Sequence, residues 1–212
     1  MLPSVCVLSD STMCDNITNT LKQCIDEGAN WIAIREYNMN DKQLYSLCEE
    51  IILYSQNNGT LISIWNNPEI AQNLQIGLHM PSRYINQNKN SSLKNNLDFD
   101  CPLGISTHNK NEILKANNLA INADYITISP IFDSISKENY SGMDKNKFID
   151  LCTYSALPVF AMGGIDENNI SQAFEYGAYG IIICGSTMKN PKILNSITTV
   201  SYTHLTLPTT HC

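Results

Sequence analysis

The chain has few charged residues (16%) and few aromatic ones (8%) among its 212 amino acids. Acidic residues outnumber basic ones by 20 to 13, which gives a formal net charge of −7 at pH 7. Proteins that bind nucleic acid through its phosphates carry a basic stripe or patch. The charge balance therefore argues against a nucleic-acid partner. It does not exclude a phosphorylated small molecule, because such a site needs only a local positive charge.

Long apolar runs are also missing. None approaches the roughly 20 residues that span a bilayer. Residues 1–9, MLPSVCVLS, lack the basic segment that opens a signal peptide. We therefore expect no membrane partner and a cytoplasmic location.

The eight cysteines form neither C-x-x-C pairs nor the spacing of a zinc finger. Cys6, Cys101 and Cys184 lie inside apolar runs. At this chain length the pattern favours reduced, mostly buried thiols over a disulfide scaffold. We predict no bound metal from clustered ligands.

What the sequence does have is an alternation of short apolar runs with segments of helical spacing. The runs are nearly continuously apolar, as in strands buried on both faces, and cover 4–9, 30–35, 60–65, 75–80, 101–106, 123–129, 157–162 and 179–184. Helices are predicted at 15–28, 41–55, 109–121, 144–152 and 167–177. Gly28 is placed to end the first helix. The Asn-rich segment 81–100 is expected to hold a short helix and a surface loop.

Eight such units predict a single (β/α)₈ TIM barrel of the α/β class. The alternative is an open doubly wound sheet, but no G-x-G-x-x-G follows the first run. We assign residues 1–199 to the barrel and expect 200–212 to be a non-native or disordered tail, because this segment is Thr-rich and follows no helical period. His204, His211 and Cys212 are accordingly not interpreted as metal ligands.

Active sites of such barrels lie at the carboxyl ends of the strands. Gly163-Gly164 and Gly185-Ser186 follow the last two runs, where glycine lets backbone N–H groups approach an anion closely. The pair favours a phosphate site, with Ser186 expected to cap the final helix. The alternative is two ordinary turns.

A long polar loop follows the sixth run, in ISPIFDSISKENYSG at 128–142. Ser134, Ser136 and Lys137 offer two hydroxyls and an ammonium group that suits phosphate. Gly142 permits a sharp turn before the next helix. The alternative is a solvated surface loop without function.

These segments resemble the thiamine-phosphate synthase and TenI superfamily over residues 4–198. The family's GPxFxTxTK element is similar to residues 129–137, its GVSTH element to 104–108, and its IPVxAIGGI element to 157–165. Stretches 123–126 and 177–181 resemble its DADYI-type and GAxGI-type segments. Thiamine-phosphate synthases join an aminopyrimidine diphosphate to a thiazole phosphate and release pyrophosphate.

The resemblance implies roles for several residues. It places Arg35 and Lys137 on the pyrophosphate and Ser106 near the pyrimidine. Ser134 and Ser136 would serve the phosphates or the thiazole. The Gly163-Gly164 and Gly185-Ser186 turns would hold the thiazole phosphate, and Mg²⁺ would help to neutralise the departing pyrophosphate.

The chain also departs from the synthase pattern. Ala33 and Tyr37 stand where synthases typically have Gln and Lys. The expected carboxylates that bind Mg²⁺ are missing, because their positions read Trp65-Asn66 and 80–83, MPSR. Mg²⁺ is thus implied by the family but lacks its usual ligands.

Segments 31–36 and 78–82 look more like the TenI branch, whose studied members tautomerise a thiazole carboxylate phosphate. That branch can use a His after the sixth strand as acid and base, but this chain has Pro130 there. His79, among apolar neighbours, is interpreted as a core or supporting residue. His108, near a helix start, is a candidate for catalysis or substrate binding.

We rank synthase-type coupling first, tautomerisation second, and non-catalytic binding of thiazole or thiamine phosphate third. Each predicts phosphorylated small-molecule partners. The sequence predicts no oligomeric state.

Overall fold

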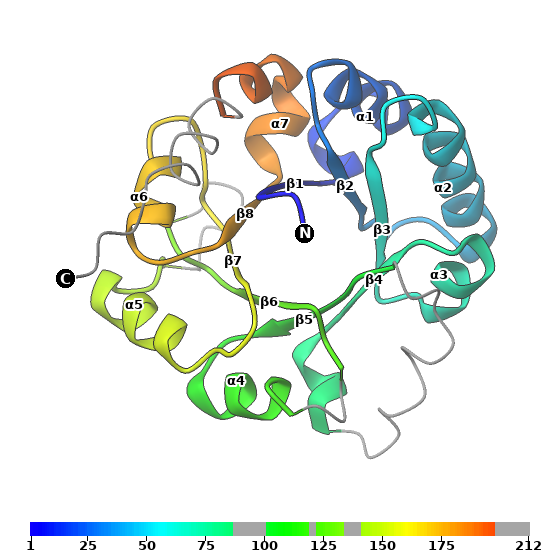
Figure 1. Ribbon diagram of the computed structural model, residues 1–212. Helices are drawn as coiled ribbons and strands as arrows, with labels where there is room; N and C mark the ends of the chain where they lie inside the picture. Colours follow the sequence, from blue (N-terminus) through cyan, green and yellow to red (C-terminus); the bar gives the residue numbers. More distant parts are fainter. Residues whose placement is uncertain (87–100, 119–121, 134–140, 198–212) are drawn as a thin grey trace.

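The computed structural model describes residues 1–86, 101–118, 122–133 and 141–197. Eight parallel strands close into a barrel in chain order, with the last strand paired to the first (Figure 1). The strands are β1 (Val5–Leu8), β2 (Trp31–Ile34), β3 (Leu61–Trp65), β4 (Gly77–Met80), β5 (Leu103–Thr107), β6 (Tyr125–Ile128), β7 (Val159–Met162) and β8 (Gly180–Ile183). The predicted TIM barrel is confirmed, and closure rules out the open sheet.

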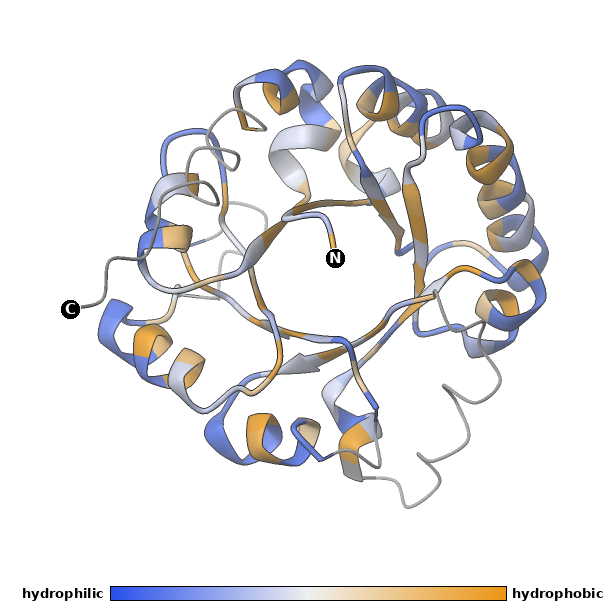
Figure 2. Cartoon of the chain, in the orientation of Figure 1, coloured by the Kyte–Doolittle hydropathy of each residue, from blue (hydrophilic) through white to orange (hydrophobic). Residues whose placement is uncertain are grey.

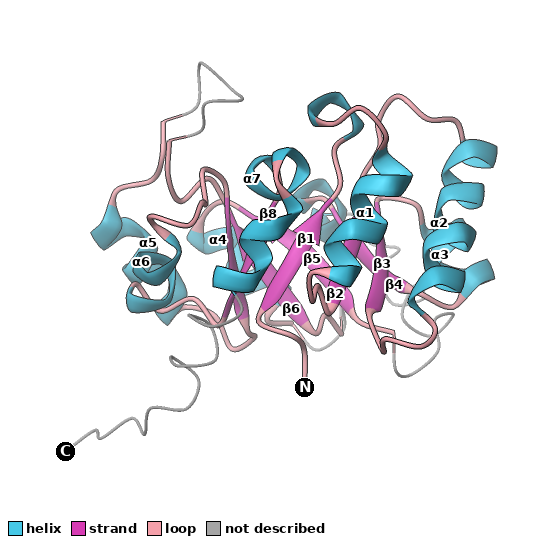
Figure 3. Cartoon of the chain, turned by 90° about the horizontal axis from the view of Figure 1, so that it is seen from above, coloured by secondary structure: helices cyan, strands magenta, loops and turns pink. Residues whose placement is uncertain are grey.

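Helices follow the strands and surround the barrel (Figures 1 and 3). They are α1 (Ile17–Asp26), α2 (Asp41–Ser55), α3 (Pro68–Leu74), α4 (Lys110–Ala116), α5 (Lys145–Thr153), α6 (Ile170–Glu175) and α7 (Gly185–Lys189), with 3₁₀ helices η1 (Ser11–Met13), η2 (Ser82–Asn86) and η5 (Pro191–Ile193). Their apolar positions face inward and their polar positions face out (Figure 2). Gly28 ends α1 as predicted, because it adopts a φ of +94° that glycine tolerates best.

Two local features differ from the sequence prediction, whereas the short helix expected within 81–100 is present as η2. Helix α3 was not predicted, because its seven residues bury only Ile70 and Ala71 and give too short an apolar stripe. The start of α3 nevertheless has a recognisable capping pattern. The Asn67 side chain accepts from the Ile70 N–H, and Pro68 occupies the first turn. The start of 81–100 forms η2, and 87–100 lies outside the described residues. The final helix is divided into α7 and η5 at Pro191.

The inside of the barrel is a packed core. Trp31 lies edge-on to Tyr125 and Phe160, with ring centroids 5.1 and 5.3 Å apart. Cys6, Leu8, Ala33 and Ile182 complete this inner cluster, and a second core fills the space between strands and helices. A ligand can therefore approach only the ends of the barrel.

The seven cysteines in the described residues are all free thiols. Four of the seven are buried and three are half-buried, which agrees with the expectation of mostly buried cysteines. Within the described part of the chain, every helix falls short of the length and hydropathy that a bilayer crossing demands.

Candidate functional site

Arg35 extends from the carboxyl end of β2 into a set of contacts from other strands. Its backbone N–H donates to Ser9 Oγ at 2.8 Å. Its guanidinium Nη2 lies 3.8 Å from Asp10 Oδ2, and the group stands 5.5 Å from the centre of the Trp65 ring. A carboxylate on one side and an aromatic face on another fix the direction of the positive charge.

His79 on β4 joins two neighbouring strands through both ring nitrogens. Its Nδ1 lies 3.0 Å from the Tyr125 hydroxyl, and its Nε2 lies 2.9 Å from Ser106 Oγ. The side chain is 1% exposed. Burial, and secondarily the charge of Arg35, hold the pKa of His79 well below its usual value of 6.5. The imidazole is therefore neutral at pH 7, and the interpretation of His79 as a buried supporting residue agrees with this geometry.

The turns after β7 and β8 are tied together. Gly163 and Gly164 adopt φ values of +101° and +67°, and the Ser186 hydroxyl donates to the Ile165 carbonyl at 3.2 Å. The prediction that Ser186 caps the last helix is wrong. Helix α7 begins at Gly185 after Cys184, and no side chain caps it. The Ser186 hydroxyl instead donates to the turn after β7.

The connection from β6 to α5 packs on the same turns. Ile131 and Phe132 donate from their backbone N–H groups to Met162 O and Gly163 O, at 3.0 and 3.1 Å. A Cβ atom on Gly164 would lie only 2.3 Å from the Asp133 carbonyl oxygen. Glycine is thus required here by loop packing as well as by φ. The predicted Ser134, Ser136 and Lys137 lie outside the described residues.

His108 follows β5 and reaches the end of β6. Its Nδ1 lies 3.2 Å from the Ser129 carbonyl oxygen. Because a carbonyl only accepts, Nδ1 must carry the proton there. In the neutral ring, Nε2 then carries no proton and can accept one.

The positions where Mg²⁺ ligands were expected include a positively charged side chain, Arg83. Arg83 Nη2 donates to Asn66 Oδ1 at 3.2 Å. Among the described residues, no three His, Cys, Asp or Glu side chains are grouped so as to hold a metal. Mg²⁺ prefers carboxylate oxygens, so the donor set around Asn66 does not fit this ion.

Two buried oxygens lack a hydrogen-bond partner in the described structure, and both belong to this end of the barrel. They are Glu36 Oε1, just after β2, and Thr127 Oγ1, near the end of β6. The other Glu36 oxygen accepts from the Ser11 N–H at 2.9 Å. Unsatisfied polar groups of this kind are rare in folded proteins, and their position agrees with a site at the strand ends.

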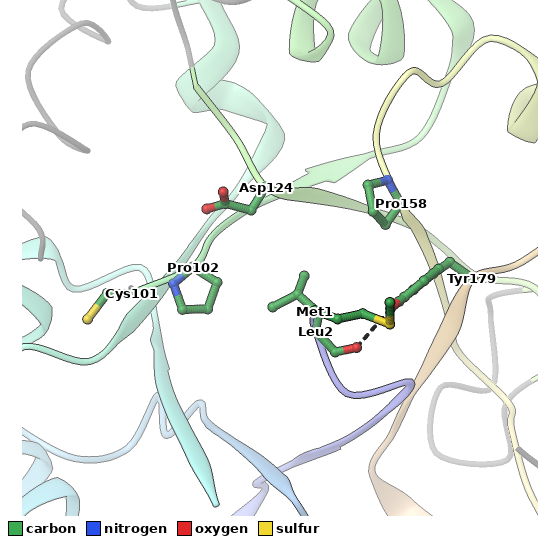
Figure 4. Close-up of a pocket in the computed structure, with 7 residues that line it drawn as sticks. All are labelled: Met1, Leu2, Cys101, Pro102, Asp124, Pro158 and Tyr179. Carbon is green, nitrogen blue, oxygen red and sulfur yellow. Dashed lines mark hydrogen bonds between the residues drawn. The ribbon is translucent and has the colours of Figure 1, made fainter. Parts of the chain in front are cut away.

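A pocket of about 420 Å³ opens at the opposite end, where the strands begin (Figure 4). It is lined by Met1, Leu2, Cys101, Pro102, Asp124, Pro158 and Tyr179. The Tyr179 hydroxyl donates to the Leu2 carbonyl across it at 2.9 Å. Because chemistry in this fold belongs to the other end, we do not assign the active site to this pocket.

The sequence profile described as thiamine monophosphate synthase matches residues 5–186. The chain belongs to the thiamine monophosphate synthase family. It is 26% identical over 197 residues to the thiamine-phosphate synthase of Persephonella marina, which covers 90% of each protein. It is 28% identical over 162 residues to that of Caldicellulosiruptor bescii, which covers 74% of this chain and 71% of the relative. The chain is thus a member of an enzyme family of transferases.

The fold is shared with a solved structure. Thiamine phosphate pyrophosphorylase from Pyrococcus furiosus matches with a TM-score of 0.81, covering 95% of this chain and 96% of that one. At 16% identity this likeness shows the barrel alone.

Two residues that the sequence pattern did not single out contact the predicted site residues. Asp10 lies two residues after the end of β1 and pairs with Arg35, and its position near a strand end was the available signal. Tyr125 contacts His79 from within an apolar run, where no pattern distinguishes it from a core residue.

Proposed function

We propose that the protein is a thiamine-phosphate synthase that couples an aminopyrimidine diphosphate with a thiazole phosphate. The observation that carries the proposal is the gathering of Arg35, Ser106 and the two glycine turns at one end of the barrel. Phosphate sites after strands 7 and 8 are common in this fold. The relatives named thiamine-phosphate synthase give the proposal its substrates.

In this reaction the C–O bond to the diphosphate breaks and the pyrophosphate leaves with the electron pair. The lone pair of the thiazole nitrogen then forms the new C–N bond. The protein has to stabilise the developing negative charge and hold the two rings in line. Arg35 supplies a fixed positive charge, and the turns at Gly163-Gly164 and Gly185-Ser186 hold the thiazole phosphate. Ser134, Ser136 and Lys137 stay assigned to the phosphates as a prediction.

The synthase proposal does not rely on Mg²⁺. At Asn66 the side-chain amide oxygen is bonded to the Arg83 guanidinium. A positively charged side chain therefore occupies the place where synthases have carboxylates that bind Mg²⁺. We therefore assign Arg83, with Arg35, to the neutralisation of phosphate. The cytoplasmic location and the use of phosphorylated small molecules belong to the same proposal.

The test is an assay of the purified chain with both substrates, with Mg²⁺ and with EDTA. Arg35→Gln should lower kcat/KM by about 10²–10³, the usual cost of losing one charge-stabilising donor. Lys22→Gln is the matched control, because Lys22 pairs with Glu50 at 2.7 Å on the outer helices and should leave activity unchanged. No thiamine phosphate under either condition would refute the synthase proposal.

One observation favours the tautomerase as a second candidate. His108 Nδ1 bonds the carbonyl oxygen of Ser129, the residue before Pro130, and Pro130 stands where the tautomerase branch carries its own His. This activity predicts interconversion of the thiazole carboxylate isomers and its loss in His108→Gln. Binding of either isomer without interconversion would eliminate it.

A further inference from the structure

A chain of hydrogen bonds crosses three strands inside the barrel, from the packed core toward the carboxyl end. Tyr125 on β6, His79 on β4 and Ser106 on β5 are joined by contacts of 3.0 and 2.9 Å through the two nitrogens of His79. Tyr125 and His79 are 1% exposed, whereas Ser106 is half-buried. The chain therefore runs from the closed interior to the surface that a ligand would meet.

Gly104 makes this connection possible. It lies in register between His79 on one neighbouring strand and Tyr125 on the other. A Cβ atom on it would lie 2.0 Å from Tyr125 Cζ, 2.3 Å from its hydroxyl and 2.5 Å from His79 Nδ1. The two side chains thus meet in the space that the glycine leaves empty.

Proton accounting fixes the direction of both hydrogen bonds. Within the described residues, the Tyr125 hydroxyl has His79 Nδ1 as its one polar partner. A buried hydroxyl proton without an acceptor is costly, so Tyr125 donates and Nδ1 accepts. The neutral imidazole then carries its proton on Nε2 and donates it to Ser106 Oγ.

We infer that Tyr125 and His79 are positioning residues that turn the Ser106 hydroxyl proton outward, so that Ser106 acts as a hydrogen-bond donor to the ligand. With a lone pair occupied by His79, the Ser106 O–H has no other partner in the described structure. Its ligand atom must accept a hydrogen bond. The reversed relay would instead leave Ser106 as an acceptor.

The surroundings favour an aromatic ring nitrogen over a phosphate oxygen as this acceptor. The Trp65 ring centre lies 4.0 Å from that of His79, so an aromatic ring packs on the residue that bonds Ser106. The two glycine turns lie on other strands, β7 and β8. We identify the acceptor as an unprotonated nitrogen of the pyrimidine ring. This identification rests on the proposed function, whereas the direction of the two hydrogen bonds through His79 does not.

The direction is tested on the ligand-free chain by ¹H–¹⁵N NMR with ¹⁵N-labelled histidine. The four histidines give separate ring signals, and His79→Gln identifies that of His79 by its loss. We expect protonated Nε2 and unprotonated Nδ1. A His79 ring protonated on Nδ1 would overturn the inference.

The consequence is tested by binding of thiamine phosphate to variants. Tyr125→Phe keeps the ring and removes only the donor, so His79 should populate both tautomers and affinity should fall about threefold to tenfold. Tyr179→Phe is the matched control, since its hydroxyl serves Leu2 at the other end of the barrel. Ser106→Ala should weaken binding at least as much.

The double variant separates positioning from a general loss of structure. In the Ser106→Ala background, Tyr125→Phe should have no further effect on affinity, because the hydroxyl that it orients is gone. Additive losses would overturn the inference. Inorganic phosphate is the second probe, and it should bind the Ser106→Ala variant as it binds the wild type. If thiamine phosphate does not bind the wild type at all, the proposed function fails while the tautomer measurement still decides the relay.

Discussion

The side chains of Arg35 and Ser106 are oriented by residues from other parts of the barrel. Asp10 and Trp65 aim the guanidinium, and His79 holds the serine oxygen. A side chain predicted from a motif becomes a site only when such neighbours fix its direction. At the residue scale, Gly104 is the position where we expect an added side chain to disturb this arrangement most, because Tyr125 and His79 fill the space beside it.

We predict that Gly104→Ala destabilises the fold by about 1–3 kcal/mol or more, because the added methyl overlaps Tyr125 and His79. Urea unfolding measures this change. Gly185→Ala is the control, since its nearest contact would be Met13 Sδ at an ordinary 3.4 Å. Equal stability of the two variants would contradict the close contact at Gly104.

At the scale of elements, the β6–α5 connection is held where it leaves and rejoins the barrel. The Gly142 N–H donates to Asp133 Oδ1 at 2.6 Å, and the Met143 N–H donates to the Pro130 carbonyl at 3.0 Å. The two ends of the long loop are thus bonded to each other, and residues 131 and 132 are bonded to the end of β7 and the turn after it. This geometry links the predicted phosphate-binding loop to the predicted phosphate-binding turn.

Asp133→Ala should raise KM for the phosphorylated substrate about threefold to tenfold, because one hydrogen bond that closes the loop is lost. Asp133→Asn keeps the accepting oxygen and should stay close to wild type. Steady-state kinetics measures both variants. A wild-type KM in Asp133→Ala would show that closure of the loop at Gly142 does not matter for binding.

At the scale of the whole molecule, buried His79 couples stability to pH. Its pKa is lowered by burial and by Arg35, while Tyr125 and Trp65 offer it no negative charge. Above pH 6.5 both folded and unfolded states hold the ring neutral. Below it, only the unfolded state takes up the proton.

The free energy of unfolding should therefore fall as pH drops below about 6.5, with a contribution from His79 that approaches about 1.4 kcal/mol per pH unit. Urea unfolding between pH 5 and 7.5 measures it. His79→Gln should show a shallower slope across this window. The same slope in both proteins would contradict a neutral His79 in the fold.

The carboxyl-terminal boundary of the barrel domain also belongs to the scale of the whole molecule. The family profile ends at residue 186, and residues 200–212 lie outside the described structure. We predict that a chain ending at residue 199 has the same free energy of unfolding and the same affinity for thiamine phosphate as the full chain. A lower value of either in the shortened chain would refute the assignment of a dispensable tail.

Much of the fold could be predicted because its signals are local. Continuous apolar runs and helical stripes need no knowledge of distant residues, and they gave all eight strands. Short elements carried too little pattern, which is why α3 was missed and Ser186 was wrongly placed at a cap. The cap of helix α7 is Cys184, two residues before the predicted Ser186, and Cys184 has no side-chain preference for a cap position.

The sequence by itself determined the barrel and the family, because periodicity and motifs are properties of neighbouring residues. Only the tertiary structure decided which side chains meet. Tyr125 and Ser106 are 19 positions apart and His79 lies on a third strand, yet barrel closure and strand register bring them within hydrogen-bonding distance. Contacts of this kind depend on the packing of the whole core, so they become visible only in the folded chain.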